Sequence, residues 1–332
     1  MTRILVTGAA GFLGFYIARR LAAEAGNSVV CVDSFVRGRR DVLYRDLTAR
    51  ANVTHITADL CDPAAVAALP DDIDVVFHMA ALNGTQNFYE RPFDVVRCCT
   101  LPTMNLIEKY GPMKRLKRFV YAGTSEAYAS TVTRFGWDVP TGEDVPLGID
   151  DIFNARWSYG ASKMHGEIAT VNGCRHFGVD FTIARFHNAY GPRMGDKHVI
   201  PDFLARARDG VFELFGHEDT RSFIYAEDAA RATILLADSE AAAGRVVNVG
   251  SEDEMTIRDL GYAVMKAAGL SGDIVLHASP KGSVKRRAPK IARLRELTGY
   301  APEWTLAAGL KETSAYYLSD KAIAYEAAPD HD

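Results

Sequence analysis

A tyrosine and a lysine in the stretch YGASK have the residue types and the spacing of a proton-transfer pair. Tyr159 and Lys163 are four residues apart, so they share one face of a helix. An ammonium group beside a phenol, together with a positively charged ring on a bound molecule, favours the phenolate and lowers the tyrosine pKa toward the working pH, which would make Tyr159 a base. For an isolated match of this pattern a solvated helix face is the simpler interpretation, so its place in the chain has to decide.

The stretch GTSEAY ends an apolar run that is typical of a buried strand. It offers three polar side chains in succession, Thr124, Ser125 and Glu126. Open α/β sheets bind their ligands at the carboxyl ends of their strands. If the strand geometry continues, the Thr124 hydroxyl and the Glu126 carboxylate point the same way, toward a substrate. The alternative is a capping cluster for the loop that follows.

A glycine-rich turn, TGAAGFLG, lies near the start of the chain between an apolar run and a helical segment. Gly8, Gly11 and Gly14 recur every three residues, and Phe12 and Leu13 lie among them. Glycine lets backbone N–H groups and the positive end of a helix approach a pyrophosphate. We therefore predict a dinucleotide-binding turn, with an ordinary structural turn as the alternative.

Asp33 ends the next strand-like run, about twenty residues after the glycines. A carboxylate there accepts hydrogen bonds from an adenosine ribose and repels a 2′-phosphate, so we predict NAD rather than NADP as the cofactor. Arg37, Arg39 and Arg40 follow closely and could attract that phosphate instead. Asp59, after the third strand-like run, is placed either to meet the adenine edge or to form a plain surface turn.

Short runs rich in Val, Ile and Phe alternate with longer helical patterns through the first 185 residues. This alternation predicts an α/β fold with a doubly wound, Rossmann-like parallel sheet that helices cover on both faces. The runs are ILV at 4, SVVCV at 28, VTHI at 53, DVVFHMA at 74, RFVYAG at 118 and DFTIARF at 180. YGASK follows the fifth run, and this position favours the functional interpretation of Tyr159 and Lys163.

Two segments depart from the alternation. The polar insertion at 129–154 contains several Gly and Pro residues, and long connections of this kind usually line a site. After Arg185 the pattern changes to short strands, including VFELFG, VVNVG and DIVLHAS, and two C-terminal helices. We predict an NAD-binding domain at 1–184 plus about 222–250, and a smaller, interleaved α/β substrate domain at 185–221 plus about 251–332.

Composition argues against several function classes. The 332 residues are 48% apolar and 24% charged, with a formal net charge of −4 and no block of like charge, so neither disorder nor a nucleic-acid-binding surface is indicated. No apolar run approaches the roughly 18 residues of a membrane helix, and a strand begins too close to Met1 for a signal peptide. Five cysteines without a CxxC pair argue against a disulfide framework. We expect a cytoplasmic protein with reduced, mostly structural cysteines, a small-molecule partner and no metal site.

Taken together, these motifs resemble the extended short-chain dehydrogenase/reductase superfamily, specifically its NAD-dependent nucleotide-sugar epimerases and dehydratases. The resemblance covers nearly the whole chain. Besides the stretches already quoted, it rests on Asp59-Leu60, HMAA at 78–81, RFHNAYGPR at 185–193, RSFIYAED at 221–228, VVNVGS at 246–251, KRRAPK and LRELTGYAP.

The resemblance implies a role for each matching residue. Thr124 would hydrogen-bond the sugar 4-hydroxyl, Tyr159 would remove its proton, and Lys163 would hold Tyr159 and the nicotinamide ribose. Leu60 and Ala80 would join the glycine turn and the two aspartates in holding NAD. The helix at 93–110 and the YGASK helix would form the four-helix bundle of a homodimer.

The resemblance also implies a set of groups that bind a nucleotide-diphosphate sugar. They are Asn83, Asn188, Arg193, Arg221 and Arg287. Arg221 and Arg287 would clasp phosphate, which suits the forked donors of arginine, although each could also form an ordinary surface salt bridge. The roles of two further residues are left open. Arg185 could reach a sugar carboxylate or hold backbone at the domain junction, and His187 could contact substrate or be packed and hydrogen-bonded within the protein.

In the family that the chain resembles, oxidation at sugar C4 gives a 4-ketone that acidifies the protons at C3 and C5, and the next step decides the product. Glu126 matches a glutamate of 4,6-dehydratases and of UDP-glucuronate decarboxylases, whereas a simple 4-epimerase needs no extra base. Ser125 stands where many dTDP-glucose 4,6-dehydratases have Asp. UDP-glucuronate decarboxylases usually have a cysteine before the tyrosine, which is Ser158 here, although Arg156 is kept.

Two GDP-mannose enzymes fit in part. GDP-mannose 4,6-dehydratases share the Thr-Ser-Glu triplet but typically use NADP, against Asp33. GDP-mannose 3,5-epimerases share RFHNAYGP and the Asn83-Gly84 loop but have a cysteine in the strand-end motif. We therefore place a nucleotide-sugar epimerase slightly ahead of a 4,6-dehydratase or UDP-glucuronate decarboxylase, that is, an isomerase ahead of a lyase of carbohydrate biosynthesis. A non-catalytic NAD-binding regulatory protein is the remote alternative.

Overall fold

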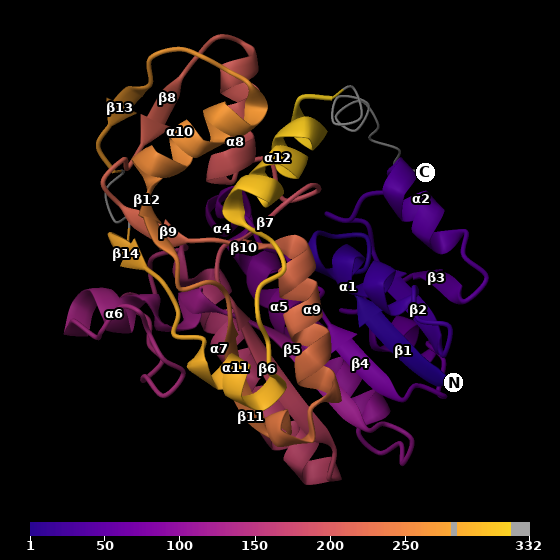
Figure 1. The fold of residues 1–332 in the computed structure, drawn as a ribbon. Helices are drawn as coiled ribbons and strands as arrows, with labels where there is room; N and C mark the ends of the chain where they lie inside the picture. Colours follow the sequence, from indigo (N-terminus) through magenta and orange to yellow (C-terminus); the bar gives the residue numbers. More distant parts are fainter. Residues whose placement is uncertain (280–283, 320–332) are drawn as a thin grey trace.

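Seven parallel strands form the central sheet of the computed structural model, which describes residues 1–279 and 284–319 (Figure 1). Their spatial order is β3-β2-β1-β4-β5-β6-β11. They are β1 Thr2–Thr7, β2 Asn27–Asp33, β3 Val53–Thr57, β4 Val75–His78, β5 Arg118–Thr124, β6 Asp180–Phe186 and β11 Arg245–Val249. Each predicted run is a strand of this sheet, VVNVG joins it at one edge, and the prediction of a doubly wound parallel sheet is confirmed.

Helices cover both faces of the sheet. On one face, α1 (Leu13–Leu21), α2 (Val42–Thr48) and α9 (Ala226–Asp238) pack against Val6 and Val120 among others. On the other face, α3 (Pro63–Ala67), α5 (Pro92–Tyr110) and α7 (Trp157–Phe177) pack against Leu5 and Phe119 among others. Because both faces are buried, the strands appear in the sequence as continuous apolar runs rather than alternating ones.

The strand order reverses between β1 and β4. Ile4 of β1 pairs with Val29 of β2 on one side and with Val75 of β4 on the other. A crevice forms at such a point outside the carboxyl ends of the strands, and ligands of open α/β sheets bind there. The glycine turn follows β1 and the HMAA stretch follows β4, so both border this crevice.

A second group of elements lies in the upper part of Figure 1. Its core is enclosed by α8 (Val199–Arg208), α10 (Ile257–Ala268) and α12 (Leu306–Tyr317). Three small sheets complete it, formed by β7 (Ala189–Tyr190) with β10 (Ile224–Tyr225), by β8 (Glu213–Phe215) with β13 (Val275–His277), and by β9 (Thr220–Ser222) between β12 (Glu254–Thr256) and β14 (Arg286–Arg287). The remaining elements are α4 Thr85–Glu90, η1 Ser125–Tyr128, α6 Ala129–Phe135, η2 Glu240–Ala242 and α11 Ala292–Thr298.

The predicted boundaries between an NAD-binding and a substrate domain stay a prediction. The substrate domain as predicted includes residues 280–283 and 320–332, which lie outside the described residues.

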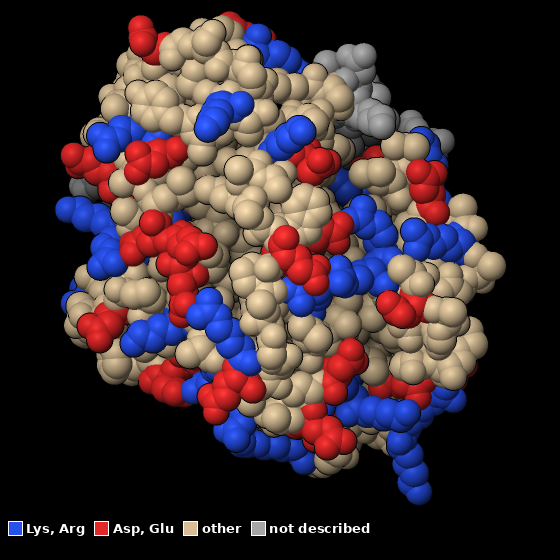
Figure 2. Space-filling view, viewed as in Figure 1, with Lys and Arg blue, Asp and Glu red and all other residues tan. Residues whose placement is uncertain are grey.

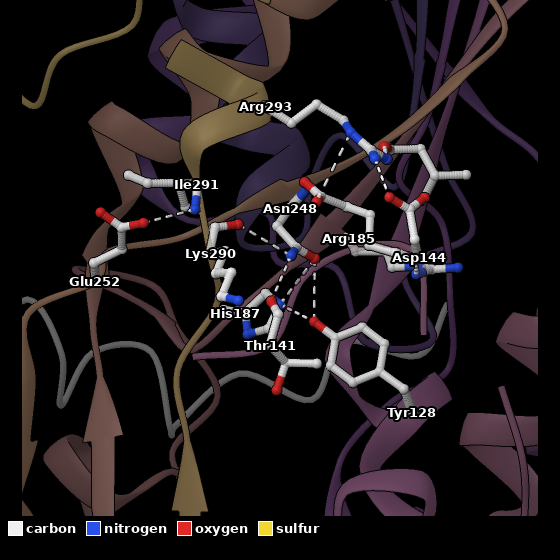
Figure 3. Close-up of polar contacts among 12 residues, drawn as sticks. Tyr128, Thr141, Asp144, Arg185, His187, Asn248, Glu252, Lys290, Ile291 and Arg293 are labelled. Carbon is white, nitrogen blue, oxygen red and sulfur yellow. Dashed lines mark hydrogen bonds and ion pairs between the residues drawn. The ribbon is translucent and has the colours of Figure 1, made fainter. Parts of the chain in front are cut away.

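A buried polar network ties the insertion at 129–154 to the edge of the sheet (Figure 3). The Asn248 amide of β11 donates to the Thr141 carbonyl at 3.0 Å, and its oxygen lies 3.2 Å from His187 Nε2. The Tyr128 hydroxyl contacts both Asn248 and His187. Burial lowers the pKa of His187 to about 3, so the ring is neutral. His187 is therefore packed within the network, which is one of the two roles that the sequence left open.

Acidic and basic side chains are interspersed on the face shown in Figure 2. Within residues 1–279 and 284–319, no helix combines the length and the apolar character needed to cross a bilayer.

Candidate functional site

A pocket of about 690 Å³ opens at the carboxyl ends of the strands, and its size is typical of small-molecule sites. It is lined by all the site residues predicted from the sequence except Arg221. The lining residues among them are Gly8, Gly11, Phe12, Leu13, Gly14, Asp33, Asp59, Leu60, Ala80, Asn83, Thr124, Ser125, Glu126, Tyr159, Lys163, Asn188, Arg193 and Arg287. The insertion at 129–154, all of which the structure describes, contributes no residue to this lining, contrary to our expectation.

The glycine turn is too tight for side chains at two of its glycines. A Cβ on Gly14 would lie 2.1 Å from the Gly8 carbonyl oxygen, and one on Gly8 would lie 2.8 Å from the Ala80 Cα. Gly8 also has φ +66°, a conformation that glycine adopts at little cost. The helix α1 begins directly after the turn, and its N-cap residue Phe12 makes no side-chain cap. The backbone N–H groups there suit an anion such as a pyrophosphate.

Asp33 is anchored to the glycine turn. Its Oδ2 accepts a hydrogen bond from Ala10 N at 2.9 Å, and its Oδ1 accepts one from Phe35 N at 2.8 Å. Burial raises the pKa of Asp33, while these backbone hydrogen bonds lower it. Each carboxylate oxygen keeps a second lone pair that could accept from a ribose hydroxyl. These features fit the adenosine half of NAD.

The three arginines after Asp33 have separate positions. Arg37 lines the pocket between Gly84 and Gly195. Arg39 pairs with Asp196 at 2.9 Å, and Arg40 stacks on Phe35 and donates to Thr57.

Asp59 follows β3, whose Thr57 pairs with Asp33, so both aspartates line the same end of the pocket, where we expect the adenosine and which we call the adenosine end. Its Oδ1 accepts from Cys61 N at 2.9 Å, and its Oδ2 lies 3.5 Å from Arg97 of α5. The adjacent Leu60 carbonyl accepts from Asn105 of α5 at 2.9 Å. The connection between β3 and α3 is thus held against α5 and leaves Asp59 at the pocket wall.

Tyr159 and Lys163 both lie on α7 and line the pocket, as the four-residue spacing predicts. The Lys163 ammonium donates to the Ala122 carbonyl of β5 at 2.9 Å. Burial raises the pKa of Tyr159, and this effect exceeds the opposing hydrogen bonds with Thr124 and Asn83. We predict that the Lys163 ammonium and a positive nicotinamide ring together lower this pKa, and that stays a prediction, because the shift above belongs to the protein's own groups.

Phe88 of α4 is a site residue that the sequence did not reveal. Its ring stacks on that of Tyr159 with centroids 5.2 Å apart and planes 14° apart. The contact fixes the orientation of the phenol toward Thr124. No spacing signal links the two residues, because α4 and α7 meet only in the tertiary structure.

Beyond Thr124, the residues Ser125 and Glu126 do not continue the strand β5 as we expected. β5 ends at Thr124, whose hydroxyl accepts from Glu126 N at 3.3 Å, and η1 begins at Ser125. The alternation that we used to align Thr124 with Glu126 therefore does not hold. Both side chains still line the pocket, because the tight turn of η1 brings Glu126 back toward it. Capping and pocket lining, which we treated as alternatives, occur together.

Glu126 lies among arginines from distant parts of the chain. Its Oε1 is 2.6 Å from Arg287 Nη1, and its Oε2 is 3.7 Å from Arg156 Nη2. Burial raises the pKa of Glu126, but the charges of Arg287, Arg156 and Arg221 outweigh it and lower this pKa overall. Burial and the nearby Arg287 in turn lower the pKa of Arg221 to about 10. Glu126 is consequently ionised, and cations are crowded around it.

Three other predicted residues are already engaged within the protein. Arg193 is almost fully buried, where it pairs with Asp41 at 2.5 Å and donates to the Ala10 carbonyl at 2.7 Å. Asn188 donates to the Ser222 carbonyl at 3.0 Å. Arg185, whose role the sequence left open, forms a buried ion pair with Glu167 at 2.7 Å, donates to the Glu143 carbonyl at 3.1 Å and does not line the pocket.

Comparisons with known proteins agree with this site. Residues 4–250 match the model of the NAD dependent epimerase/dehydratase family. A UDP-N-acetyl-alpha-D-glucosaminuronate decarboxylase from Bacillus cytotoxicus is 32% identical over 328 residues, which cover 95% of this chain and 97% of that protein.

Two solved structures have the same fold. The UDP-glucuronic acid 4-epimerase from Bacillus cereus, in complex with UDP-glucuronic acid and NAD, superposes with a TM-score of 0.84 at 25% identity over 95% of this chain and 99% of that one. The dTDP-glucose 4,6-dehydratase from Streptomyces venezuelae, with NAD bound, superposes with a TM-score of 0.84 at 25% identity over 95% of this chain and 97% of that one. The chain therefore belongs to the NAD dependent epimerase/dehydratase family of extended short-chain dehydrogenases/reductases, which are enzymes of nucleotide sugars, and its cofactor is NAD.

Proposed function

We propose that the enzyme decarboxylates a nucleotide-diphosphate hexuronate through a transient 4-ketone. The observation that carries the proposal is the arginine-bound Glu126 beside Thr124 and Tyr159, a region that we call the sugar end of the pocket. A decarboxylase of a UDP-hexuronate is 32% identical over nearly the whole chain, which supports this choice. Bound NAD supplies the acceptor for the C4 hydride and later returns it.

Thr124, Tyr159 and Lys163 act on the sugar 4-hydroxyl in this proposal. Thr124 orients the hydroxyl, and the Tyr159 phenolate removes its proton. Burial raises the pKa of Tyr159 and lowers that of Lys163. Formation of the phenolate would therefore draw on the Lys163 ammonium and on the positive charge that a bound nicotinamide ring would supply. Phe88 holds the phenol ring in place throughout.

The sugar end of the pocket favours an anionic substrate. Arg287 and Arg156 lie 2.6 and 3.7 Å from Glu126, and Arg221 lies 3.9 Å from Asp219. An anionic group on the substrate would relieve the repulsion that contributes to the lowered pKa of Arg221. A hexuronate carboxylate and a nucleotide diphosphate both meet this requirement.

Oxidation at C4 turns a hexuronate into a β-keto acid, in which the C6 carboxylate is attached to the carbon next to the ketone. The C5–C6 bond can then break, with its electron pair passing to the C4 oxygen and carbon dioxide leaving. Thr124 and the protonated Tyr159 stabilise the resulting enolate, because both hydroxyls are placed to donate to the C4 oxygen. Ionised Glu126 accepts hydrogen bonds, and we assign it the orientation of the water that protonates C5.

Epimerisation, which the sequence placed slightly ahead without fixing the carbon, is the second candidate, and we consider it at C4. It is favoured by the likeness to the UDP-glucuronic acid 4-epimerase of Bacillus cereus. Ser125 argues against 4,6-dehydration in either case, because its buried hydroxyl is a far weaker acid than a carboxyl group. The two candidates share the same oxidation step and differ in whether the 4-keto acid is protected from losing carbon dioxide.

We assign the nucleotide diphosphate to Arg221 and Asn188, with Asn83 close to the sugar. Arg287, which was also predicted to clasp phosphate, we assign to Glu126 at the sugar end. Arg193 was predicted to join them, and its burial beside Asp41 assigns it instead to holding the glycine turn.

We further propose a homodimer in which α5 and α7 meet their counterparts in a four-helix bundle. The two helices pack on each other within the chain and leave large apolar side chains exposed. On α5 these are Phe93, Val96, Leu101 and Met104, and on α7 Ile168 is 62% exposed. A second copy would cover them. A cytoplasmic location also stays a prediction.

The experiment that tests the reaction is mass spectrometry of a nucleotide-sugar panel incubated with enzyme and NAD in deuterated water. UDP-glucuronate, UDP-N-acetylglucosaminuronate, UDP-glucose, dTDP-glucose and GDP-mannose make up the panel. Decarboxylation predicts loss of carbon dioxide from a uronate and one solvent deuterium at C5. An unchanged formula with a shifted retention time would instead establish an epimerase.

The Tyr159→Phe variant tests whether the protein is an enzyme or a regulatory protein that only binds NAD. It should keep NAD and the stacking contact with Phe88 but form no product. A protein whose only role is to bind NAD would be indifferent to this change.

A further inference from the structure

Two cysteines from distant segments meet at the wall of the dinucleotide pocket. Cys61 follows Asp59 and Leu60 in the connection between β3 and α3, and Cys98 lies on α5. The Cys61 thiol lies 4.0 Å from the carbonyl oxygen of Arg97, the residue before Cys98 on α5, and the two thiols influence each other's pKa directly. Both cysteines line the pocket. Cys31 and Cys174 are buried and do not line the pocket.

The surroundings of Cys98 favour its thiolate. The interaction with the Cys61 thiol and the charge of Arg97 lower the pKa of Cys98, against burial and the carboxylates of Asp59 and Asp94, which raise it. The same contact raises the pKa of Cys61, which therefore remains a thiol. Because the thiolate is the reactive form, Cys98 is the nucleophile of the pair and Cys61 is the partner that can resolve its oxidation.

We propose that Cys61 and Cys98 form a reversible disulfide that controls the binding of NAD at the adenosine end of the pocket. The oxidant is a peroxide. The Cys98 thiolate attacks one peroxide oxygen, the O–O bond breaks, and a sulfenic acid forms while the second oxygen leaves as water. The Cys61 sulfur then attacks the Cys98 sulfur, the S–O bond breaks, and a second water leaves. A dithiol reductant reverses the reaction by thiol–disulfide exchange.

The disulfide would act on NAD through the connection between β3 and α3. Forming the bond draws Cys61 toward α5, and Cys61 N is the donor that positions the Asp59 carboxylate at 2.9 Å. The hydrogen bond from Asn105 to the Leu60 carbonyl limits how far the connection can adapt. Asp59 and Leu60 are the residues that we assign to the adenine edge. If the disulfide weakens NAD binding by a given factor, bound NAD must lower the equilibrium constant for disulfide formation by the same factor.

This proposal depends on the dinucleotide pocket and is independent of the reaction at the sugar end. The test uses the full chain, treated with hydrogen peroxide with and without saturating NAD. Peptide mass spectrometry without reduction should find a Cys61–Cys98 link, whose formation NAD slows by at least about fivefold, the lower end of ordinary coupling between sites. Calorimetric titration should show NAD affinity lowered by a similar factor in the oxidised protein and restored by dithiothreitol.

Matched variants distinguish the effect of a Cys61–Cys98 disulfide from the effects of peroxide on other residues. Cys98→Ser and Cys61→Ser should each bind NAD equally before and after peroxide, and Cys61→Ser should accumulate a sulfenic acid at Cys98 that dimedone traps. Cys174→Ser, which removes a buried thiol of α7, should behave as the unaltered chain does. Absence of a Cys61–Cys98 link after peroxide treatment overturns the proposal. So does a link that forms but leaves NAD affinity unchanged.

Discussion

Arg287 Nη1 lies 2.6 Å from Glu126 Oε1, although 161 residues separate them in the sequence. The pair joins β14 of the second group of elements to the end of β5 in the central sheet. Any movement of this second group of elements that opens the pocket must therefore lengthen the ion pair between Arg287 and Glu126 at the sugar end of the pocket. Substrate binding and the protonation state of Glu126 are coupled through this contact.

The first prediction concerns that contact. Arg287→Ala should lower turnover by about 10²–10³, as expected when one electrostatic partner of a developing charge is removed. It should lower the affinity for UDP much less, because the structure places the guanidinium on Glu126. Steady-state kinetics and a UDP titration separate the two effects. A large loss of UDP affinity with unchanged turnover would show that Arg287 serves the diphosphate only.

Arg286→Ala provides a matched control for this prediction. Arg286 is the neighbouring residue of β14, and it pairs on the surface with Glu254 at 2.7 Å. Its removal should leave turnover and UDP affinity nearly unchanged.

The second prediction concerns Arg193, which joins the second group of elements to the glycine turn. Its side chain is 1% exposed and that of Asp41 is 12% exposed, so Arg193→Met leaves a carboxylate buried without its partner. The free energy of unfolding should fall by about 3–5 kcal/mol in a urea titration. Replacing both residues, as in Arg193→Met with Asp41→Asn, should recover part of the loss, because the Asn amide is uncharged and can still accept from Tyr44 N at the start of α2.

Arg206→Met is the control for Arg193. Arg206 forms a more exposed pair with Asp202 on α8, so its loss should cost no more than about 1 kcal/mol. Equal losses for Arg193→Met and Arg206→Met would contradict the role that the structure gives to Arg193.

The central sheet could be predicted from the sequence because parallel strands that are buried on both faces appear as continuous apolar runs. Each run predicted in the first 185 residues is a strand, and YGASK is on a helix. The helix α6 was missed because Gly and Pro dominate the insertion that it begins. Its last residue, Phe135, precedes Gly136 in the left-handed conformation, which is a helix-ending signal that the sequence contains.

The contacts that shape the chemistry of the site could not be predicted in this way. Glu126 with Arg287, Phe88 with Tyr159 and Cys61 with Cys98 each join segments that are distant in the chain. Periodicity and spacing report only which residues share an element. The direction of the Tyr159 pKa shift likewise depends on how completely α7 and α4 exclude water from the phenol, which no local pattern encodes.

The third prediction concerns two buried, neutral histidines. Burial lowers the pKa of His78 and of His187 to about 3 in the folded protein, whereas an unfolded histidine titrates near pH 6.5. Between these values the unfolded chain binds more protons than the folded one, so stability rises with pH and is lost as the pH falls from about 6.5 toward 3. Each histidine should contribute about 1.4 kcal/mol per pH unit in that window.

Urea unfolding at pH 7.5 and pH 5.5 measures this effect. His78→Asn and His187→Asn should each remove part of the histidine contribution to the pH dependence, whatever their effect at pH 7.5. The rest comes from His55 and His198, whose pKa burial also lowers. A pH dependence that stays the same in both variants would mean that other groups cause the acid sensitivity.

The last prediction compares two glycines that differ only in what surrounds them. A Cβ at Gly14 would lie 2.1 Å from the Gly8 carbonyl oxygen, whereas one at Gly26 would meet no atom within 4 Å. Gly14→Ala must displace the backbone that we expect to hold the pyrophosphate, so NAD affinity should fall at least about tenfold, or ~1.4 kcal/mol. Gly26→Ala should leave NAD affinity unchanged in the same calorimetric titration. If both variants bound NAD as well as the unaltered chain, the pyrophosphate would have to lie elsewhere, because no neighbour of Gly14 can yield except the turn itself.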